Sequence, residues 1–595
     1  MIKGKLEKII QESLENLKSH SDHFSGAVFE IEGFSGIDHG DYAVTIRNII
    51  EGGLKRGHDF ETTKFTQDDG EVILEEIKKH PDFDKIFDRA EFKFPVFFNF
   101  FTNKKVLLDE LKQVFKKKQN YGFSSGWKDK KVIVEFTDPN PFKEFHIGHL
   151  YSNIVGEAIS RFSGAVGARV KRINYQGDVG LHVAKAVWGI EQKIVSEKIN
   201  FAKLESKPLK ERIVFLGQAY VLGANAFEED NTAKEEIVEL NKKIFKLDKT
   251  IKNVYQKGRR WSLLYFEKIY KRLGTKFDSY YFESEVAPTG EKLVKDGLKR
   301  GIFKESEGAI IFPGENYGLH NRVFINSQGL PTYEAKELGL ALAKNKDFKY
   351  DLSIIITGNE IVEYFKVLIA ALEAVLPDLG VKTLHIPHGM VRFSSGKMAS
   401  RKGNIITAEQ LLDNIKDLAI GIVDSSKNLS RKEKNTVVEM VTIGAVKYSW
   451  LKNRIGQDII FDPEQSLNIK GNSGPYLQYT CVRCDSVIRK AKIQKLGSEI
   501  ITGNVGFGEE EMEIIRTIIR FPEIVVEAAK KFSPNLICNF AFNLAQKYNA
   551  FYDRYPIAIA KEKDVRQARL VLTAATAQVL KNALFLLGIN VPKRM

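Results

Sequence analysis

The sequence predicts a multidomain α/β protein: a small α+β domain, a parallel-sheet α/β domain with a helical insertion, and an all-helical domain. Its 595 residues exceed one domain, because domains usually hold roughly 100 to 200 residues. Hydrophobic residues make up 43% and charged residues 28%, which is typical of globular proteins and excludes a disordered chain. The β-branched run KVIVEF at 131–136 precedes a Pro-rich turn and an apolar helical pattern, which indicates a buried parallel strand.

In the first part of the chain, 1–118, segments with helical periodicity alternate with strand-like segments. Helical periodicity at 3–18, 71–80 and 104–118 and the aromatic run FKFPVFFNF predict a small α+β domain. Gly, Ser and Asn in 119–130 predict a linker. The first residues carry charges every two or three positions and so lack the apolar centre of a signal peptide. No apolar stretch approaches the length of about 18 residues that a membrane span needs, so we expect a cytoplasmic protein with no membrane partner.

The α/β domain is expected at 131–410, with a helical insertion at about 185–273 where strand-like text stops. Its first strand, a following helix and a second strand with a Gly-containing turn form a βαβ unit. Strand-like text returns after the insertion and a further helix follows it. The expected elements are a helix at 149–163, strand text at 171–180, 308–312, 322–325 and 351–358, and a helix at 361–375.

The last part of the chain is predicted to be nearly all helical. Thr407 and Gln410 have the spacing of a capping box that begins a helix. We divide this part into a helical connection at 411–465 and an all-helical domain at 466–595.

The net charge and the cysteine content limit which kinds of partner and which cellular compartment are expected. The formal net charge is +14, and 466–595 holds 19 Lys plus Arg against 11 Asp plus Glu, so the helical domain is the expected surface for a polyanion. Three cysteines, at 481, 484 and 538, are too few for a disulfide framework and indicate a reducing compartment. A zinc site would need about four ligands, so we expect buried thiols and no metal site.

The first motif with chemistry is DPNPFKEFHIGH at 138–149, between the first strand and the next helix. Nucleotides bind there in α/β sheets, because the N–H groups and the dipole of a helix N-terminus favour phosphate. His146 and His149 can both face that phosphate, and Gly148 permits close backbone approach. Taken alone, the two histidines are equally compatible with a structural or metal-binding role.

The second motif is GKMASRKGN at 396–404, a basic loop after strand-like text. Small residues and three cations suit a mobile phosphate clamp. By itself, such a run is more often a solvated basic loop.

Together and in this order, the two motifs resemble the HIGH and KMSKS motifs of class I aminoacyl-tRNA synthetases. The surrounding text resembles the arginyl-tRNA synthetase family along almost the whole chain. The segments that carry the resemblance are HGDYAVTIRNI, VEFTDPNPFKEFHIGHLYSNIVGEAI, NYQGDVG, PTYEAKEL, GNSGPYLQYTCVR and VLKNALFLLGINVPKRM. The resemblance implies a Rossmann-like catalytic domain, a tRNA elbow-binding N-terminal domain, a stem-contact connection and an anticodon-binding helical domain.

The resemblance also implies an activity. ATP, with Mg²⁺, would activate L-arginine to arginyl-adenylate, and the arginyl group would pass to the 3′-terminal adenosine of tRNA(Arg) without a covalent enzyme intermediate. The enzyme is expected to be a monomer. The implied catalytic residues are His146, His149 and Lys397, and the implied ATP-binding residues also include Lys143, Gly148, Met398, Ser400 and Arg401. In this loop Ser400 stands where the family's motif has a lysine, so the motif does not identify which cation meets the pyrophosphate.

Carboxylates suit a guanidinium, which binds them in a planar, bidentate way. The resemblance implies arginine-binding roles for Glu135, Asn140, Tyr333, Glu337 and Glu360. Glu337 replaces the family's usual Asp, and Tyr333 and Glu337 also fit ordinary helix-packing and solvated roles. For tRNA, the resemblance implies Tyr476, Tyr479 and Met595; the two tyrosines also fit helix packing.

Three alternatives stay open at this point. They are a class I synthetase for another amino acid, a small-molecule nucleotidylyltransferase, and a non-catalytic tRNA-binding paralogue. The basic helical domain and the separate N-terminal domain argue against a small-molecule enzyme. Retention of both histidines and of the loop cations argues against a non-catalytic descendant.

Overall fold

The computed structural model describes residues 1–21, 24, 27–32, 40–49, 62–63, 66–394, 407–424, 429–491, 501 and 506–595. The chain forms two compact units. The first unit comprises 1–123, 480–526 and 540–583, and the second comprises 124–479, 527–539 and 584–595.

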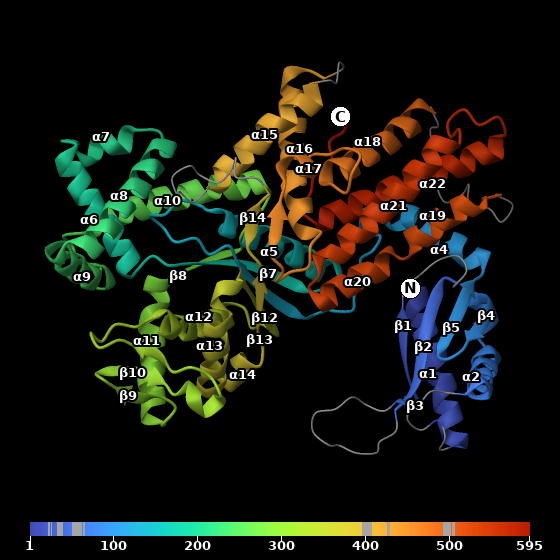
Figure 1. Ribbon diagram of the computed structural model, residues 1–595, viewed down its shortest axis with the longest axis horizontal. Coiled ribbons are helices and arrows are strands. Elements are labelled where there is room, and N and C mark those ends of the chain that lie inside the picture. Colours follow the sequence, from blue (N-terminus) through green and yellow to red (C-terminus); the bar gives the residue numbers. More distant parts are fainter. Residues whose placement is uncertain are drawn as a thin grey trace. The chain divides into compact units, whose positions relative to one another are not determined.

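The first unit contains an antiparallel sheet in the order β1-β2-β5-β4, with β3 paired to β2 (Figure 1). The strands are β1 (Ala27–Glu32), β2 (Tyr42–Ile49), β3 (Thr62–Thr63), β4 (Phe87–Lys93) and β5 (Phe97–Thr102). The N-terminal helices are α1 (Ile2–His20), α2 (Gln67–Lys79), α3 (Phe83–Ile86) and α4 (Lys104–Lys117). Each predicted helix forms, because apolar residues recur every three or four positions and become buried, as Leu6, Ile9 and Ile10 do in α1.

The same unit joins the N-terminal sheet to C-terminal helices. The Tyr42 hydroxyl donates to Glu523 Oε1 at 2.9 Å, and Arg516 Nε lies 2.8 Å from Asp41 Oδ1. The helical tail consists of α18 (Gly474–Lys490), α19 (Glu509–Ile519), α20 (Phe521–Lys531), α21 (Pro534–Arg554) and α22 (Lys563–Leu586). The predicted all-helical character of this tail is therefore confirmed in the described residues.

The second unit is built on a parallel sheet in the order β13-β12-β6-β7-β8. Its strands are β6 (Lys131–Phe136), β7 (Arg169–Gln176), β8 (Ser279–Phe282), β12 (Leu352–Gly358) and β13 (Thr383–His388). The run 132–136 in the central strand β6 is buried throughout, as expected for a strand covered on both faces. After β6 the chain adds β7 on one side and later β12 on the other, so a topological switch point lies between β6 and β12.

Helices surround this sheet. The crossover helix α5 (Ile147–Ala165) follows β6. The predicted insertion forms one group of helices between β7 and β8 (Figure 1): α6 (Leu181–Ser196), α7 (Phe201–Ser206), α8 (Leu209–Glu229), α9 (Asn231–Phe245) and α10 (Lys252–Leu273). The later helices are α11 (Glu283–Lys299), α12 (Tyr333–Asp347), α13 (Val362–Val375), α14 (Pro377–Gly380), α15 (Ala408–Asp424), α16 (Arg431–Leu451) and α17 (Pro463–Ser466).

Two predicted strands form outside the parallel sheet. The strand-like runs at 308–312 and 322–325 do form β10 (Ala309–Phe312) and β11 (Arg322–Ile325). They pair with β9 (Lys304–Ser306) in a separate antiparallel sheet and do not extend the parallel sheet. Strand-like text after 390 forms β14 (Val391–Phe393), which pairs with β15 (Ile459–Phe461).

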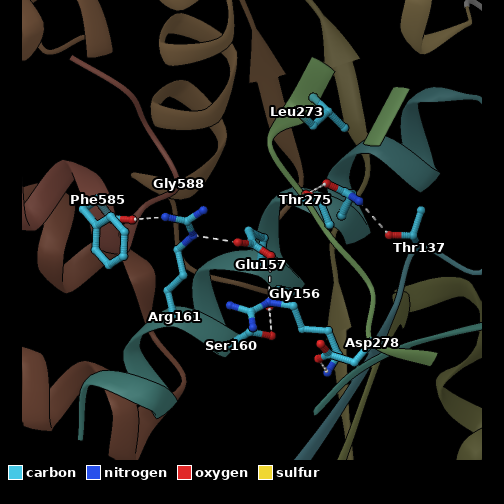
Figure 2. Close-up of polar contacts among 12 residues, drawn as sticks. Thr137, Gly156, Glu157, Ser160, Arg161, Leu273, Thr275, Asp278, Phe585 and Gly588 are labelled. Carbon is cyan, nitrogen blue, oxygen red and sulfur yellow. Dashed lines mark hydrogen bonds and ion pairs between the residues drawn. The ribbon is translucent and has the colours of Figure 1, made fainter. Parts of the chain in front are cut away.

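A buried polar cluster anchors the C-terminal half of α5 (Figure 2). Glu157 accepts from Arg161 Nε at 2.6 Å and from Arg172 Nε at 3.0 Å. Arg161 also donates to the carbonyl of Phe585 at 2.9 Å. Close by, the buried Lys447 ammonium donates to two backbone carbonyls, those of Leu273 and Gly588, at 2.7 Å each. This cluster holds in place the helix whose other end carries His146 and His149.

The helix α15 begins as the capping box predicts. Thr407 N donates to Gln410 Oε1 and Gln410 N donates to Thr407 Oγ1, each at 3.2 Å. The two bonds satisfy amide groups that the first turn of a helix otherwise leaves unpaired.

Candidate active site

A cavity of about 430 Å³ opens at the carboxyl ends of β6 and β12, at the switch point of the parallel sheet. Eight of the residues predicted from the sequence line it: Glu135, Asn140, His146, Gly148, His149, Tyr333, Glu337 and Glu360. Lys143 is not among its lining residues; its ammonium lies 4.5 Å from the centre of the Tyr220 ring in α8. Lys397, Met398, Ser400 and Arg401 fall within 395–406, outside the described residues.

The predicted tRNA residues belong to other parts of the chain. Tyr476 and Tyr479 lie half-buried on α18. Met595 ends the C-terminal segment that begins at residue 584.

The turn after β6 has an unusual backbone. Thr137 and Asp138 have φ values of 83° and 42°, in the left-handed region that costs a non-glycine residue about 1–3 kcal/mol. Two bonds hold the turn. Asp138 Oδ1 accepts from Tyr175 N at 2.8 Å. Asn153 Nδ2 donates at 3.0 Å to Oγ1 of Thr137, which is labelled in Figure 2. Contacts with β7 and α5 therefore maintain this strained backbone conformation. The conformation directs the chain toward the start of α5.

His146 and His149 cap the N-terminus of α5. His146 Nδ1 accepts from Gly148 N at 3.1 Å and from His149 N at 3.4 Å, while His149 Nδ1 accepts from His146 N at 3.3 Å. A Cβ on Gly148 would lie 3.0 Å from the His146 ring, so glycine suits this close approach. Because both Nδ1 atoms accept from backbone N–H groups, the proton of each neutral imidazole is on Nε2.

Both imidazoles are neutral at physiological pH. Burial and, next, the nearby Lys143 charge lower the pKa of His146 to about 4. Burial and then the His146 charge lower the pKa of His149 well below its ordinary value. The pair therefore offers uncharged Nε2–H donors at a helix N-terminus, a combination suited to phosphate oxygens.

A second part of the cavity lining is acidic. Glu135 is 1% exposed, and its Oε2 accepts from Lys344 Nζ at 2.7 Å. Burial, and then the Glu135 charge, raise the pKa of Glu337 well above its ordinary value, and the same two causes raise the pKa of Asp138. Glu283, which also lines the cavity, is paired with the buried Lys336. A cluster of acidic side chains such as this one favours a cationic ligand.

The mouth of the cavity is formed by a chain of contacts. Tyr333 Oη lies 3.2 Å from His182 Nδ1, and His182 Nε2 lies 2.8 Å from the carbonyl of Gly177. Burial lowers the pKa of His182 to about 3, so its ring is neutral, donating to Gly177 and accepting from Tyr333. A Cβ on Gly177 would lie 2.4 Å from Asn140 Oδ1, so this glycine lets Asn140 approach the backbone.

Several residues around the cavity were not predicted from the sequence as site residues. They are Asp138, Tyr175, His182, Glu283, Lys344 and His388. Asp138 stood within the first motif, and His182 is the second residue after NYQGDVG. Lys344 is seven residues after Glu337, two turns along the same face of α12, so helical periodicity could have found it.

The three cysteines are free and buried, as expected. Burial raises the pKa of the Cys484 thiol to about 12.

Comparisons with known proteins agree with this geometry. Residues 110–463, more than half of the chain, match the family described as tRNA synthetases class I (R), catalytic domain. Residues 477–595 match the DALR anticodon binding domain.

Curated relatives and solved structures extend the match to the whole chain. The arginine–tRNA ligase of Borrelia hermsii is 30% identical over 90% of this chain and 91% of its own. That of Clostridium perfringens is 30% identical over 86% of this chain and 88% of its own. The fold matches arginyl-tRNA synthetase from Thermus thermophilus with a TM-score of 0.78 at 21% identity, covering all of both chains.

The catalytic-domain match, the anticodon-domain match and the relatives all point to one enzyme family. The chain belongs to the arginyl-tRNA synthetases, a branch of the class I aminoacyl-tRNA synthetases.

Proposed function

We propose that this chain activates L-arginine with ATP in the cavity at the switch point and then transfers the arginyl group to tRNA(Arg). The observation that supports this most is the division of the cavity. Neutral histidine donors at a helix N-terminus form the first part of its lining, and the acidic side chains of Glu135, Asp138 and Glu337 form the second. A phosphate fits the first part, and a guanidinium fits the second.

Activation would be an in-line displacement. The carboxylate of arginine attacks the α-phosphorus of ATP, the bond to the bridging oxygen breaks, and pyrophosphate leaves. His146 and His149 would donate through Nε2 to phosphate oxygens, which gain charge in the transition state. Gly148 gives the backbone room there, and Lys397, Met398, Ser400 and Arg401 would meet the departing phosphates. Lys143, whose ammonium contacts Tyr220, would approach the phosphates after leaving that ring.

Arginine would lie between these two parts of the lining. Glu135 and Glu337 would receive the guanidinium, with the Tyr333 ring beside it, and Asn140 would hold the amino-acid end. Glu360 lies exposed on the cavity rim, from which it can reach the substrate. Transfer then moves the arginyl group from the adenylate to a ribose hydroxyl of the terminal adenosine, releasing AMP.

Mg²⁺ is expected to accompany ATP. It is usually held by one or two carboxylates together with substrate phosphates, and Glu360 offers a carboxylate of this kind at the rim. When bound, the ion would neutralise charge on the phosphates.

The remaining parts of the chain would bind tRNA. We propose that 1–118 meets the elbow, with 119–130 as its linker, that 131–410 is the catalytic domain, that 411–465 meets the acceptor stem, and that 466–595 holds the anticodon loop. Half-buried Tyr476 and Tyr479 would stack on unpaired bases, and Met595 would contact the same loop.

We also propose a cytoplasmic monomer, since charged tRNA is used in translation and all three thiols are free. In the described part of the chain, no helix is both long and apolar enough to span a bilayer.

Charging of unfractionated tRNA with each of the twenty amino acids tests the proposal. We expect arginine alone to be attached. Attachment of another amino acid in its place would contradict it.

A further inference from the structure

A buried cation lies behind the carboxylate that is proposed to read arginine. Lys344 is near the C-terminus of α12, and its Nζ donates to Glu135 Oε2 at 2.7 Å and to Ser353 Oγ at 3.2 Å. The side chains of Lys344 and Glu135 are each 2% exposed. Glu135 lines the cavity and Lys344 does not, so the lysine contacts the carboxylate from the side away from the substrate.

The charges that surround this pair are mostly negative. Asp138, after β6, and Glu337, on α12, lie close enough for the Glu135 charge to raise the pKa of each, after burial. Glu283, from α11, is engaged by Lys336. The nearby tyrosines are protonated at neutral pH, since burial raises the pKa of each; they are Tyr175, Tyr281, Tyr350 and Tyr364. Lys344 is therefore the cation in direct contact with Glu135 among the described residues.

Lys344 keeps its charge in this setting. Burial acts to lower its pKa, but the Glu135 carboxylate and the other anionic groups outweigh that effect, and the pKa is raised overall. The contact is therefore an ionised pair, and one Glu135 oxygen, Oε2, is committed to it.

We propose that Lys344 is a positioning residue for arginine recognition. Its Nζ binds Glu135 Oε2 and so fixes the orientation of this carboxylate before the substrate arrives, which leaves Oε1 for the guanidinium. The proposal rests on the proposed function, because it assumes that Glu135 binds arginine.

Removing Lys344 has two opposing effects on arginine. Its positive charge repels the guanidinium, so its loss favours binding. Its loss also leaves the buried Glu135 beside Asp138 and Glu337 without a contacting cation, which favours the protonated form of this carboxyl group in the variant. Arginine binding to the variant would then release that proton, so binding weakens about tenfold for each unit by which the solution pH is lowered. The second effect dominates at low pH and disappears at high pH.

The test compares the arginine KM of Lys344→Met with that of the parental enzyme from about pH 6 to 9. We expect the KM of the variant to be raised about tenfold or more at pH 7 and to fall to the parental value or below it at pH 9. The ATP KM should change less than about twofold, since Lys344 does not line the cavity. A raised KM that is independent of pH, or equal rises for arginine and ATP, would overturn the proposal.

Lys447→Met is the matched control. Lys447 is also a buried lysine, but its Nζ binds the carbonyls of Leu273 and Gly588 and it does not line the cavity (Figure 2 shows these two residues). Its variant should lose stability and keep the parental pH profile of the arginine KM. A shift like that of Lys344→Met would show that general destabilisation causes the effect, and would overturn the proposal.

Two further variants make the result specific. Lys344→Arg keeps the charge and should keep the parental pH profile; a profile shifted like that of Lys344→Met would contradict the role of charge. Because Lys344 acts through Glu135, Lys344→Met should add little to Glu135→Gln, and additive effects would exclude that route. Lys344→Gln replaces the methionine variant, with the same expected outcomes, if thermal unfolding shows that the latter does not fold. Absence of arginine-dependent turnover in the parental enzyme would instead reject the proposed function.

Discussion

The imidazole rings of His146 and His149 stack with their centres 3.5 Å apart, and the Nδ1 atom of each accepts a backbone N–H group of the other residue. This reciprocal cap fixes the tautomer and orientation of both rings before any substrate binds. The structure of the motif therefore explains why two histidines at this spacing, with Gly148 between them, begin α5: they close its N-terminus and keep both Nε2–H donors available.

We expect His146→Asn to separate capping from catalysis. Asn is a good N-cap residue, so the free energy of unfolding should change by less than about 1 kcal/mol. Its amide lacks the reach of Nε2, and the single-turnover rate of adenylate formation should fall about 10²- to 10³-fold. His146→Ala, the control, should lose the same activity and also about 1 kcal/mol of stability. Full activity of His146→Asn would show that His146 has no role in adenylate formation.

Glu135→Gln should impair arginine binding much more than ATP binding. The change leaves Lys344 unpaired and the guanidinium poorly matched, and breaking a buried pair costs about 3–5 kcal/mol. Kinetics should show an arginine KM raised roughly a hundredfold or more, with the ATP KM nearly unchanged.

Glu157→Gln is the matched control for that variant. Glu157 is also buried and pairs with two arginines, but it lies outside the cavity lining. It should lower stability without changing the arginine KM. Parental arginine affinity in Glu135→Gln would make Glu135 a structural residue only.

Arginine affinity should rise with pH. The folded enzyme has raised pKa values at Glu337 and Asp138, whereas a guanidinium binds their ionised forms. Arginine KM should therefore fall as pH rises from about 5 to 8, while the neutral histidines add nothing above their lowered pKa values.

Thermal unfolding supplies an independent check of the same linkage. Without arginine, a carboxyl group whose pKa is raised on folding makes the folded state less stable as pH rises above its unfolded value of about 4. Saturating arginine should offset that loss. An arginine KM that does not change with pH would contradict the raised pKa values.

Lys397→Ala tests the basic loop, which lies outside the described residues. Charge moves onto the β- and γ-phosphates as the α-phosphorus bond breaks, so a cation there stabilises the transition state more than bound ATP. The single-turnover rate of adenylate formation should fall about 10²- to 10³-fold, with a smaller change in ATP affinity. If Lys397→Ala is normal while Arg401→Ala or Lys402→Ala is slow, the later cations have the role proposed for Lys397.

The elements that could be predicted from the sequence are those with a contiguous sequence pattern of their own. The strand at 131–136 was predicted with its observed bounds, because a continuous apolar run bounded by Pro is typical of a central parallel strand. The strands β8 and β13 were missed, because they lie at the sheet edges and carry half-buried polar or aromatic residues. The separate sheet of β9, β10 and β11 depends on contacts that no local pattern encodes.

The site followed the same rule. The two histidines were predictable, since their motif is contiguous. The pairing of Glu135 with Lys344 spans 209 residues and requires β6 and α12 to meet, which only the folded chain specifies. The contact of Lys143 with Tyr220 likewise depends on where the insertion packs.

Exchange of labelled pyrophosphate into ATP tests the central claim most directly, because it reports the activation step alone. Each of the twenty amino acids is supplied in turn, with and without tRNA(Arg). We expect exchange with arginine only, and only when tRNA(Arg) is present. Exchange supported by a different amino acid, or none with arginine and tRNA(Arg) together, would contradict the assignment of this cavity to arginine activation.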